Sequence, residues 1–429
     1  MQCIHRPLPF SFLAATLLVL GGCGQPAPSG PDQSRSAEAP VAPVAPEAKA
    51  RELSRKYLIV DTHIDVPYRL LETPADVSKA TKDGDFDYPR AVAGGLDALF
   101  MSIYIPADVD AEGKAGELAN SLIDSMEALA AAAPEKFAVA TCAADLPALK
   151  GQGRIALPLG MENGGPIAGS FETLRHFRDR GIRYITLAHS KSNHISDSSY
   201  DENEQWQGLS EFGRTLIGEM NRQGVMIDVS HITDRAFWQV IELTEVPIIA
   251  SHSSLRHFTP DFHRNMSDDM VAALKANGGV IQINFGSSFL TADANGYGGK
   301  LQEAAQSFAA GMGLKEDDPL LEKFAADYRA EHPYPFATVA DVLDHIDRAV
   351  MLAGIDHVGL GSDYDGVGDS LPVGLKDVSQ YPNLIAGLIE RGYSDADIEK
   401  ILGGNLLRVW RQVEAFATAA GNPPACTQA

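Results

Sequence analysis

Eight short apolar runs, rich in Val, Ile and Leu, alternate with amphipathic stretches along most of the 429 residues. Each run is apolar through its middle, as expected for parallel strands that are covered on both faces. Eight such strands alternating with helices favour an α/β fold of the (β/α)8 TIM barrel type. A doubly wound open sheet is the alternative, but no Gly-rich dinucleotide fingerprint follows the first run. The runs span residues 57–65, 96–105, 155–162, 184–189, 225–231, 247–252, 279–285 and 357–363.

Amphipathic segments between and after these runs predict the helices of such a barrel. Segment 286–335 is too long for an ordinary loop, which predicts a helical insertion before the last strand. We therefore expect one barrel domain over residues 51–418, followed by a flexible C-terminal tail over residues 419–429. The predicted helices span residues 117–133, 171–180, 210–223, 234–243, 268–276, 339–353, 378–391, 395–402 and 405–416.

The N-terminus has the layout of a secretory signal, with Arg6 ahead of an apolar run at 10–20 that is too short to span a bilayer. The Leu-Gly-Gly-Cys sequence that ends at Cys23 resembles the lipobox of bacterial lipoproteins. It implies removal of signal peptide 1–22 and acylation of Cys23, with an ordinary signal peptide cut nearby as the alternative. Residues 23–50 are rich in Pro and Ala, which predicts a disordered tether. We expect the protein in the bacterial cell envelope, lipid-anchored, facing the periplasm or on the outer membrane.

The net charge restricts the classes of binding partner, and the cysteine count restricts the possible disulfides. A formal net charge of -22 argues against nucleic acid and against electrostatic docking on anionic lipid, so membrane contact is expected through the lipid anchor only. Of the four cysteines, Cys3 would leave with the signal and Cys23 would carry lipid. The sequence leaves open whether Cys142 and Cys426 form a disulfide, and neither has metal-site spacing.

Polar residues gather at the ends of six of the eight runs. The first run, YLIVDTHIDVP, ends with Asp61, His63 and Asp65, which strand alternation predicts to share one face. The C-terminal ends of all barrel strands meet at one rim, where active sites are built. A lone His or Asp at a strand end is usually a turn former, but several together are costly to bury without a cation. The other strand-end residues are Glu162, His189, His231, His252 and Asp363.

The types of ligand at this rim indicate which metal would bind. Imidazoles and carboxylates without thiolates favour Zn²⁺ or another first-row divalent ion over an iron–sulfur or calcium site. One ion needs about three protein ligands, fewer than are available. Two ions that share a carboxylate would use the whole set.

The motifs DTHIDVP, LPLGMENGG, RYITLAHSKSN, MIDVSH, IASHSS, HRNMSDD, HVGLGSDYDGV and GGNLLRVW occur in this order along the chain. Together they resemble the membrane (renal) dipeptidase family, peptidase family M19, a group of zinc amidohydrolases. The resemblance implies two zinc ions per chain. Their ligands would be His63 and Asp65 for the first ion, His231 and His252 for the second, and Glu162 as the bridge between them.

The resemblance also implies roles for three further residues. His189 would lie over the substrate carbonyl, Arg264 would bind the substrate's terminal carboxylate, and Asp363 would transfer protons. The implied function is a zinc-dependent dipeptidase that hydrolyses dipeptides through a metal-bridging hydroxide. The resemblance leaves open whether the C-terminal residue of the substrate can be a D-residue. It also implies a homodimer. The alternatives are a metal amidohydrolase acting on N-acyl amino acids or lactams, and a non-catalytic peptide- or metal-binding surface lipoprotein. Phe289 stands where some family members have a substrate-side Tyr.

Overall fold

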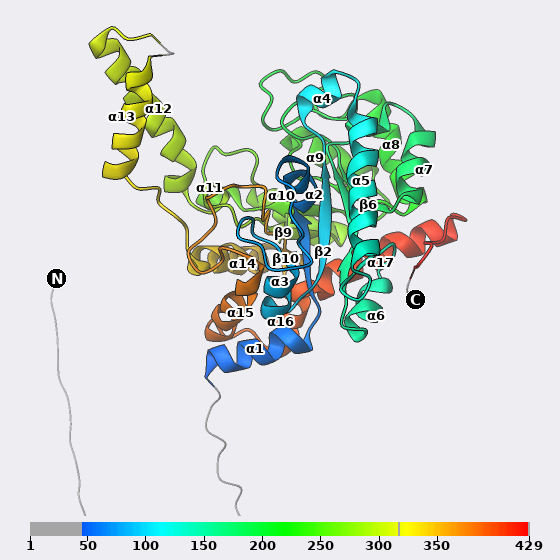
Figure 1. Ribbon diagram of the computed structural model, residues 1–429. Coiled ribbons are helices and arrows are strands. Elements are labelled where there is room, and N and C mark those ends of the chain that lie inside the picture. Colours follow the sequence, from blue (N-terminus) through cyan, green and yellow to red (C-terminus); the bar gives the residue numbers. More distant parts are fainter. Residues whose placement is uncertain (1–44, 316–317, 428–429) are drawn as a thin grey trace, which may run out of the picture. The chain divides into compact units, whose positions relative to one another are not determined.

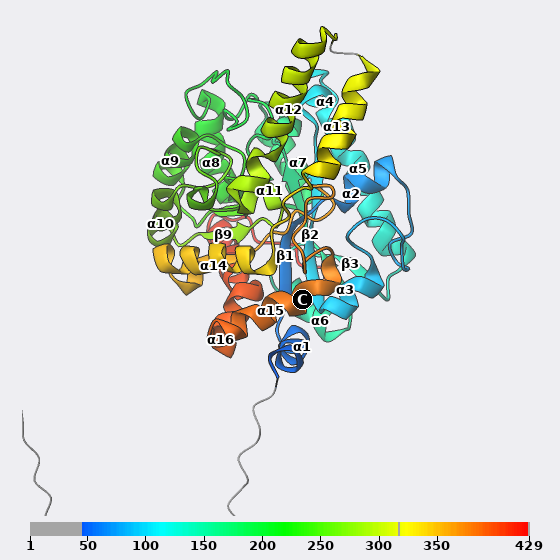
Figure 2. The ribbon, with the colours of Figure 1, turned by 90° about the vertical axis from the view of Figure 1, so that its left-hand side faces the viewer.

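Eight parallel strands form a closed barrel in the computed structural model, which describes residues 45–315 and 318–427 (Figures 1 and 2). The ring runs β1-β10-β9-β8-β7-β6-β5-β2, and it closes because β1 pairs with both β10 and β2. The predicted (β/α)8 barrel is therefore confirmed. Its strands are β1 (Ile59–Ile64), β2 (Leu96–Tyr104), β5 (Leu159–Glu162), β6 (Ile182–Thr186), β7 (Met226–Asp228), β8 (Ile249–Ser253), β9 (Val280–Ile283) and β10 (Val358–Leu360).

The predicted run at 155–162 divides into two strands. Pro158 separates β4 (Ile155–Leu157) from β5, because proline has no N–H to continue the ladder. Strand β5 stays in the barrel, whereas β4 pairs with β2 and with β3 (Phe137–Val139), a short strand outside the ring that we did not predict.

Helices surround the barrel where amphipathic segments predicted them. Their starts follow local capping chemistry: the side chains of Ser170, Ser210, Thr233 and Ser267 each accept a backbone N–H of the first turn. The surrounding helices are α5 (Ala115–Ala132), α7 (Phe171–Asp179), α8 (Glu211–Gln223), α9 (Asp234–Leu243), α10 (Asp268–Asn277), α14 (Val339–Ala353), α15 (Tyr381–Glu390), α16 (Asp395–Glu399) and α17 (Asn405–Ala419). Shorter or flanking helices are α1 (Pro46–Lys56), α2 (Val66–Glu72), α3 (Tyr88–Gly94), α4 (Ala107–Ala111) and α6 (Asp145–Gly151).

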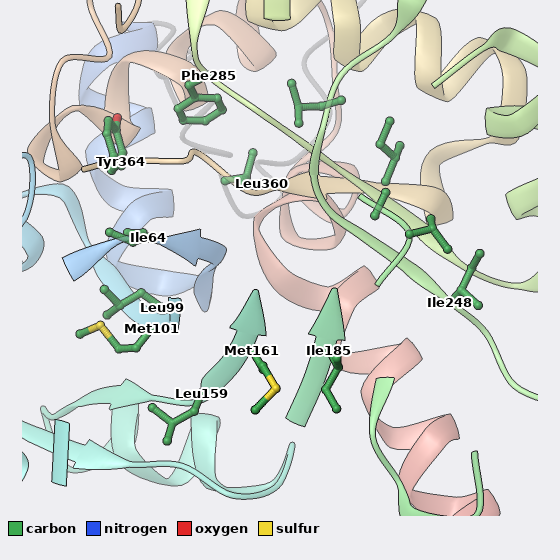
Figure 3. Close-up of a cluster of buried hydrophobic side chains, with 14 of the residues drawn as sticks. Ile64, Leu99, Met101, Leu159, Met161, Ile185, Ile248, Phe285, Leu360 and Tyr364 are labelled. Atoms are coloured by element: carbon green, nitrogen blue, oxygen red, sulfur yellow. The ribbon is translucent and has the colours of Figure 1, made fainter. Parts of the chain in front are cut away.

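Side-chain alternation along the strands separates two apolar clusters. Leu99, Met101, Leu159 and Met161 face outward and pack beneath the helices (Figure 3). The interior cluster is closed at its base by α17, whose Trp410 ring lies 5.3 Å from that of Phe100. Residues between the outward positions therefore face the barrel interior, and near the C-terminal rim they are polar.

The segment between β9 and β10 is helical, as predicted. It comprises α11 (Ser287–Leu290), α12 (Ala292–Met312) and α13 (Pro319–Glu331). Helices α12 and α13 form a hairpin that projects from the barrel (Figures 1 and 2), held partly by stacking of Phe308 on Phe324 at 4.6 Å.

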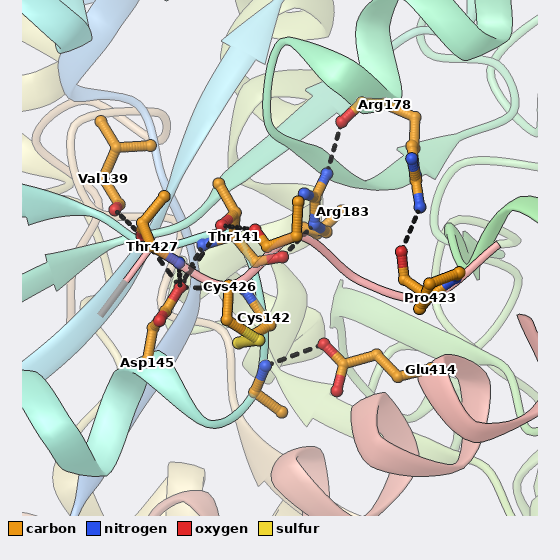
Figure 4. Close-up of a disulfide and its surroundings, with 12 residues drawn as sticks. Val139, Thr141, Cys142, Asp145, Arg178, Arg183, Glu414, Pro423, Cys426 and Thr427 are labelled. Atoms are coloured by element: carbon orange, nitrogen blue, oxygen red, sulfur yellow. Dashed lines mark hydrogen bonds between the residues drawn. A yellow bond between two sulfur atoms is a disulfide. The ribbon is translucent and has the colours of Figure 1, made fainter. Parts of the chain in front are cut away.

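Cys142 and Cys426 form a disulfide, which settles the pairing that the sequence left open (Figure 4). The bond joins the residues after α17 to the segment that leads into α6. Asp145 accepts hydrogen bonds from the backbone N–H groups of Thr141 at 2.8 Å and Thr427 at 3.2 Å, so both sides of the bridge share one carboxylate. The flexibility expected of residues 419–429 stays a prediction.

The predicted signal peptide, Cys23 and residues 23–44 of the predicted tether lie outside the described residues. Within residues 45–315 and 318–427, no helix combines the length and the apolar character that crossing a membrane requires.

Candidate metal centre

The C-terminal rim of the barrel brings the polar strand-end residues together. His63 lies in β1 and Asp65 directly follows that strand, whereas Glu162 ends β5 and His252 lies in β8. A pocket of about 550 Å³ opens over them. The residues of the predicted set that line this pocket are Asp65, Glu162, His189, His231, His252 and Asp363.

A β-bulge in β1 changes one prediction about this rim. Strand alternation predicted that Asp61, His63 and Asp65 share a face, but the register of β1 against β2 shifts between Asp61 and Ile64. An extra residue in one strand reverses the alternation beyond it. His63 consequently points into the barrel, whereas the carboxylate of Asp61 points outward to Tyr381 on α15.

Glu162 lies at the middle of the cluster, and its two carboxylate oxygens face different histidines. Oε2 is 3.3 Å from Nε2 of His63 and accepts a 3.1 Å hydrogen bond from Ser102. Oε1 is 3.2 Å from Nε2 of His231 and 3.2 Å from Nε2 of His252, and these two nitrogens are 2.9 Å apart. One carboxylate thus faces two separate groups of candidate ligands.

The first of these groups contains His63, Asp65 and Asp363, whose ligand atoms lie close enough to hold one ion. Nε2 of His63 is 3.4 Å from Oδ2 of Asp65. This nitrogen is fully buried and has no hydrogen-bond partner among the described residues. A buried nitrogen left facing two carboxylates fits a cation, because such groups are costly to bury unsatisfied.

Electrostatics at the cluster favour a positive ion. Burial raises the pKa of Glu162, but the neighbouring His63 and His189 outweigh burial and hold that pKa well below its usual value. The carboxylate is therefore ionised. Burial and the charge of Arg264 lower the pKa of His231 well below its usual value, which keeps its imidazole neutral. Ionised carboxylates and neutral imidazoles are the forms that bind metal.

His252 and His63 differ in their titration. Burial, with the charges of His63 and Arg264, lowers the pKa of His252 well below its usual value. Burial also lowers the pKa of His63, but the Tyr184 hydroxyl and the carboxylates of Glu162 and Asp65 outweigh it and raise that pKa well above its usual value. The protein thus attracts positive charge to the position between His63, Asp65 and Glu162.

Asp363 combines a strained backbone with a shifted pKa. Its φ of 64° is in the left-handed region, as is the φ of 70° at His231, and such strain concentrates at functional sites. Burial and the charge of Asp65 raise the pKa of Asp363 to about 7. Asn284 donates a 2.7 Å hydrogen bond to Oδ2 of Asp363. A carboxyl group with this pKa suits proton transfer near neutral pH.

Arg264 is buried beside the pocket. Its side chain donates to Oγ of Ser253 at 2.7 Å and to the carbonyl of His252 at 2.8 Å, and it lies over the ring of Phe289 at 5.3 Å. Its Nε has no hydrogen-bond partner, and no carboxylate pairs with the guanidinium among the described residues. A buried cation of this kind is suited to an anionic ligand.

Sequence reasoning missed residues of the site that are neither histidines nor acids. Tyr104 ends β2, lines the pocket and packs edge-on against His189 at 4.8 Å. Asn284 directly follows β9 and donates a hydrogen bond to Asp363. These are the ends of the two strands that we had not assigned to the site, so the same strand-end argument, extended to Tyr and Asn, would have found them. Tyr68 and Tyr200 also line the pocket, but both lie on segments beyond the strands.

A (β/α)8 barrel with imidazoles and carboxylates grouped at its C-terminal rim defines a metal-dependent hydrolase. The chain belongs to the membrane dipeptidase family, peptidase family M19, whose model matches residues 47–423. It is accordingly a metal-dependent dipeptidase.

Two curated relatives and one solved structure illustrate the similarity. An uncharacterised dipeptidase of Schizosaccharomyces pombe is 31% identical over 393 residues, covering 86% of this chain and 84% of its own. The dipeptidase tcpJ of Claviceps purpurea is 32% identical over 353 residues, covering 80% and 73%. The crystal structure of the probable dipeptidase PvdM from Pseudomonas aeruginosa superposes with a TM-score of 0.74 at 29% identity, covering 87% of this chain and 99% of that one.

Proposed function

We propose that this dipeptidase binds two zinc ions per chain, with His63 and Asp65 on the first ion and His231 and His252 on the second. Glu162 would bridge the ions. The observation that carries this proposal is the division of Glu162, whose Oε2 faces His63 and whose Oε1 faces His231 and His252. When bound, zinc supplies Lewis acidity that lowers the pKa of water and polarises a carbonyl group.

The chain's own residues then move the protons. A carboxylate oxygen of Asp363 accepts the proton of the attacking water and returns it to the leaving amine. Its pKa of about 7 lets it act in both directions near neutral pH. Burial lowers the pKa of His189, so the neutral imidazole donates an N–H to the substrate carbonyl and stabilises the oxygen that becomes negative.

Arg264 would select substrates with a free C-terminal carboxylate. Support comes from its buried guanidinium, which has an unpartnered Nε and no carboxylate partner among the described residues. A charge-assisted bond to the carboxylate would place the scissile amide one residue away, over the metal centre. A longer peptide has no carboxylate at that distance, which explains a preference for dipeptides.

The test uses purified protein with metal analysis and a panel of L,L and L,D dipeptides. We expect about two zinc ions per chain and turnover of dipeptides, with acetylated amino acids and a lactam as comparison substrates. Asp363→Asn should lower kcat by several orders of magnitude. Full activity in that variant would refute its role in proton transfer. Arg264→Gln should abolish the preference for a free over an amidated C-terminus; an unchanged preference would remove Arg264 from substrate binding.

The same proposal places the protein in the bacterial cell envelope, anchored through acylated Cys23 and facing the periplasm or on the outer membrane. The disulfide between Cys142 and Cys426 supports an oxidising compartment, because cytosolic thiols are kept reduced. Metabolic labelling with a radioactive fatty acid should mark the wild type and not Cys23→Ser, and fractionation should find the label in membranes. We also propose that the protein is a homodimer, and analytical ultracentrifugation should then give the mass of two chains.

A further inference from the structure

Tyr184 fixes the orientation of the His63 imidazole from within the barrel. Its hydroxyl donates a 3.0 Å hydrogen bond to the carbonyl oxygen of Thr62. A carbonyl can only accept, so the single hydroxyl proton is used there. The hydroxyl oxygen lies 2.8 Å from Nδ1 of His63 and must therefore accept from an Nδ1–H group. Nε2 is then the ring nitrogen that faces Glu162 and Asp65.

The fold makes room for this contact. Tyr184 comes from β6 and is fully buried, while His63 comes from β1, so the tyrosine ring crosses the barrel interior. On β5, the strand next to β6, a Cβ at Gly160 would lie 2.0 Å from the Tyr184 ring. Glycine at position 160 is therefore required for the ring to reach His63.

Ser251 does the same for His252. Its hydroxyl donates a 2.6 Å hydrogen bond to Oδ2 of Asp228 and lies 2.7 Å from Nδ1 of His252. The hydroxyl proton is again used, so Nδ1 of His252 carries the proton that the serine oxygen accepts. Nε2 of His252 is left facing Oε1 of Glu162 at 3.2 Å.

Asp228 fixes the position of the Ser251 hydroxyl, because several donors hold the carboxylate of Asp228 in place. The carboxylate is fully buried at the end of β7. It accepts the backbone N–H of Ser230 at 3.0 Å, the backbone N–H of Ser251 at 2.8 Å and the hydroxyl of Thr186. A carboxylate fixed by these bonds leaves the Ser251 hydroxyl one direction in which to donate.

His231 has no such support among the described residues. Its Nε2 faces Glu162 and His252, but its Nδ1 is buried without a hydrogen-bond partner. The two hydroxyl contacts are therefore specific to His63 and His252, one in each of the two ligand groups that Glu162 faces.

We infer that Tyr184 and Ser251 are positioning residues that hold His63 and His252 as Nδ1–H tautomers, with both Nε2 lone pairs reserved for metal. The inference rests on the proposed ligand roles of the two histidines. Without the hydroxyl, each imidazole can take the other tautomer or turn its ring over, and either change removes the nitrogen from the ion. Mutation of a residue that hydrogen-bonds a metal-bound histidine typically weakens metal binding by about 10- to 100-fold.

The test measures zinc affinity of the full-length protein by competition with a chromophoric chelator. Tyr184→Phe and Ser251→Ala should each weaken the binding of one zinc ion by about 10- to 100-fold. The matched controls are Tyr393→Phe and Ser54→Ala, which remove hydroxyls bonded to Asp347 and to the Arg51 carbonyl away from the pocket, and they should bind zinc like the wild type. Unchanged affinity in both folded variants would overturn the inference.

A second measurement needs no variant. Nitrogen NMR of the wild-type protein, labelled on histidine, should show Nδ1–H protons on two zinc-bound imidazoles, each assigned by its loss in His63→Gln or His252→Gln. Nε2–H tautomers at these residues would contradict the inference even if the variants failed to fold. The proposed function fails separately: if His63→Gln and His252→Gln keep both zinc ions, the ligand roles themselves are wrong.

Discussion

The hydroxyl of Tyr381, on a helix outside the barrel, donates a 2.5 Å hydrogen bond to Oδ2 of Asp61 in β1. Asp61 also accepts the backbone N–H groups of His63 and Ser362, each at 3.0 Å. The three donors come from α15, from β1 and from the residues after β10. Asp61 therefore fixes the bulged strand from behind the metal centre, on the face opposite to His63.

Asp61→Ala should destabilise the protein by roughly 3–5 kcal/mol, because three buried donors lose their acceptor. Tyr381→Phe removes one of the three bonds and should cost about 1–2 kcal/mol. Urea unfolding of the metal-free protein measures both values. Since the two residues share one bond, Tyr381→Phe should cost much less in the Asp61→Ala background. Strictly additive effects would show that the contact carries no stability.

The hydrogen bond from Asn284 opposes the rise in the pKa of Asp363. Oδ1 of Asn284 accepts the backbone N–H of Gly286 at 2.7 Å, which turns its amide nitrogen toward Asp363. A hydrogen bond to the ionised carboxylate lowers its pKa, in opposition to the upward effect of burial. Asn284→Ala should therefore raise the pKa of Asp363.

The pH profile of kcat/KM reads this change. If Asp363 acts as the base in its ionised form, the acid limb of the profile should move to higher pH in Asn284→Ala, so the loss of activity is largest at low pH. Asn383→Ala removes a comparable amide bond to the Gly374 carbonyl at the surface and serves as the control. An acid limb that stays in place, or moves to lower pH, would show that Asn284 does not lower the pKa of Asp363.

The sequence predicted the barrel because parallel strands and their helices leave strong local patterns. The same reasoning predicted that the residues proposed for the metal centre lie together, since the C-terminal ends of the strands meet at one rim of a barrel. The face of Asp61 was predicted wrongly because a bulge is set by pairing with β2, which no local pattern records. Tyr184 and Ser251 were not assigned because their roles depend on hydrogen bonds between strands, visible only once the barrel is closed.

Buried His345, on α14, links pH to stability. The backbone N–H of Leu255 donates to its Nδ1 at 3.0 Å, and its Nε2 donates to the carbonyl of Leu290 at 3.0 Å. The protonated ring could not accept the first bond. Burial accordingly lowers its pKa from 6.5 to about 4.

Proton uptake at His345 sets the direction in which folding stability changes with pH. Between about pH 6.5 and about pH 4 the unfolded chain binds a proton at His345 that the folded chain excludes, so folding stability falls as the pH falls. The loss should reach roughly 3 kcal/mol. His345→Gln can keep both bonds without titrating, so its stability should fall less over this range. Urea midpoints of wild type, His345→Gln and the surface control His176→Gln measure the difference; equal slopes in all three would contradict it.

The disulfide should stabilise the fold without affecting catalysis. It links Cys142 to Cys426 across 284 residues, and closing so long a loop restricts the unfolded chain strongly. None of the residues at the bridge lines the active-site pocket. Replacing both cysteines by serine should therefore lower the free energy of unfolding by about 2–5 kcal/mol and leave kcat and zinc content unchanged.

A reducing agent should shift the urea midpoint of the wild type toward that of Cys142→Ser/Cys426→Ser and have no effect on the double variant. This comparison separates the bond from the substitutions, because the serines cannot respond to reductant. A wild-type midpoint that ignores the reducing agent would mean that the bridge contributes nothing to stability. Loss of zinc from the double variant would instead show that the disulfide supports the candidate metal centre.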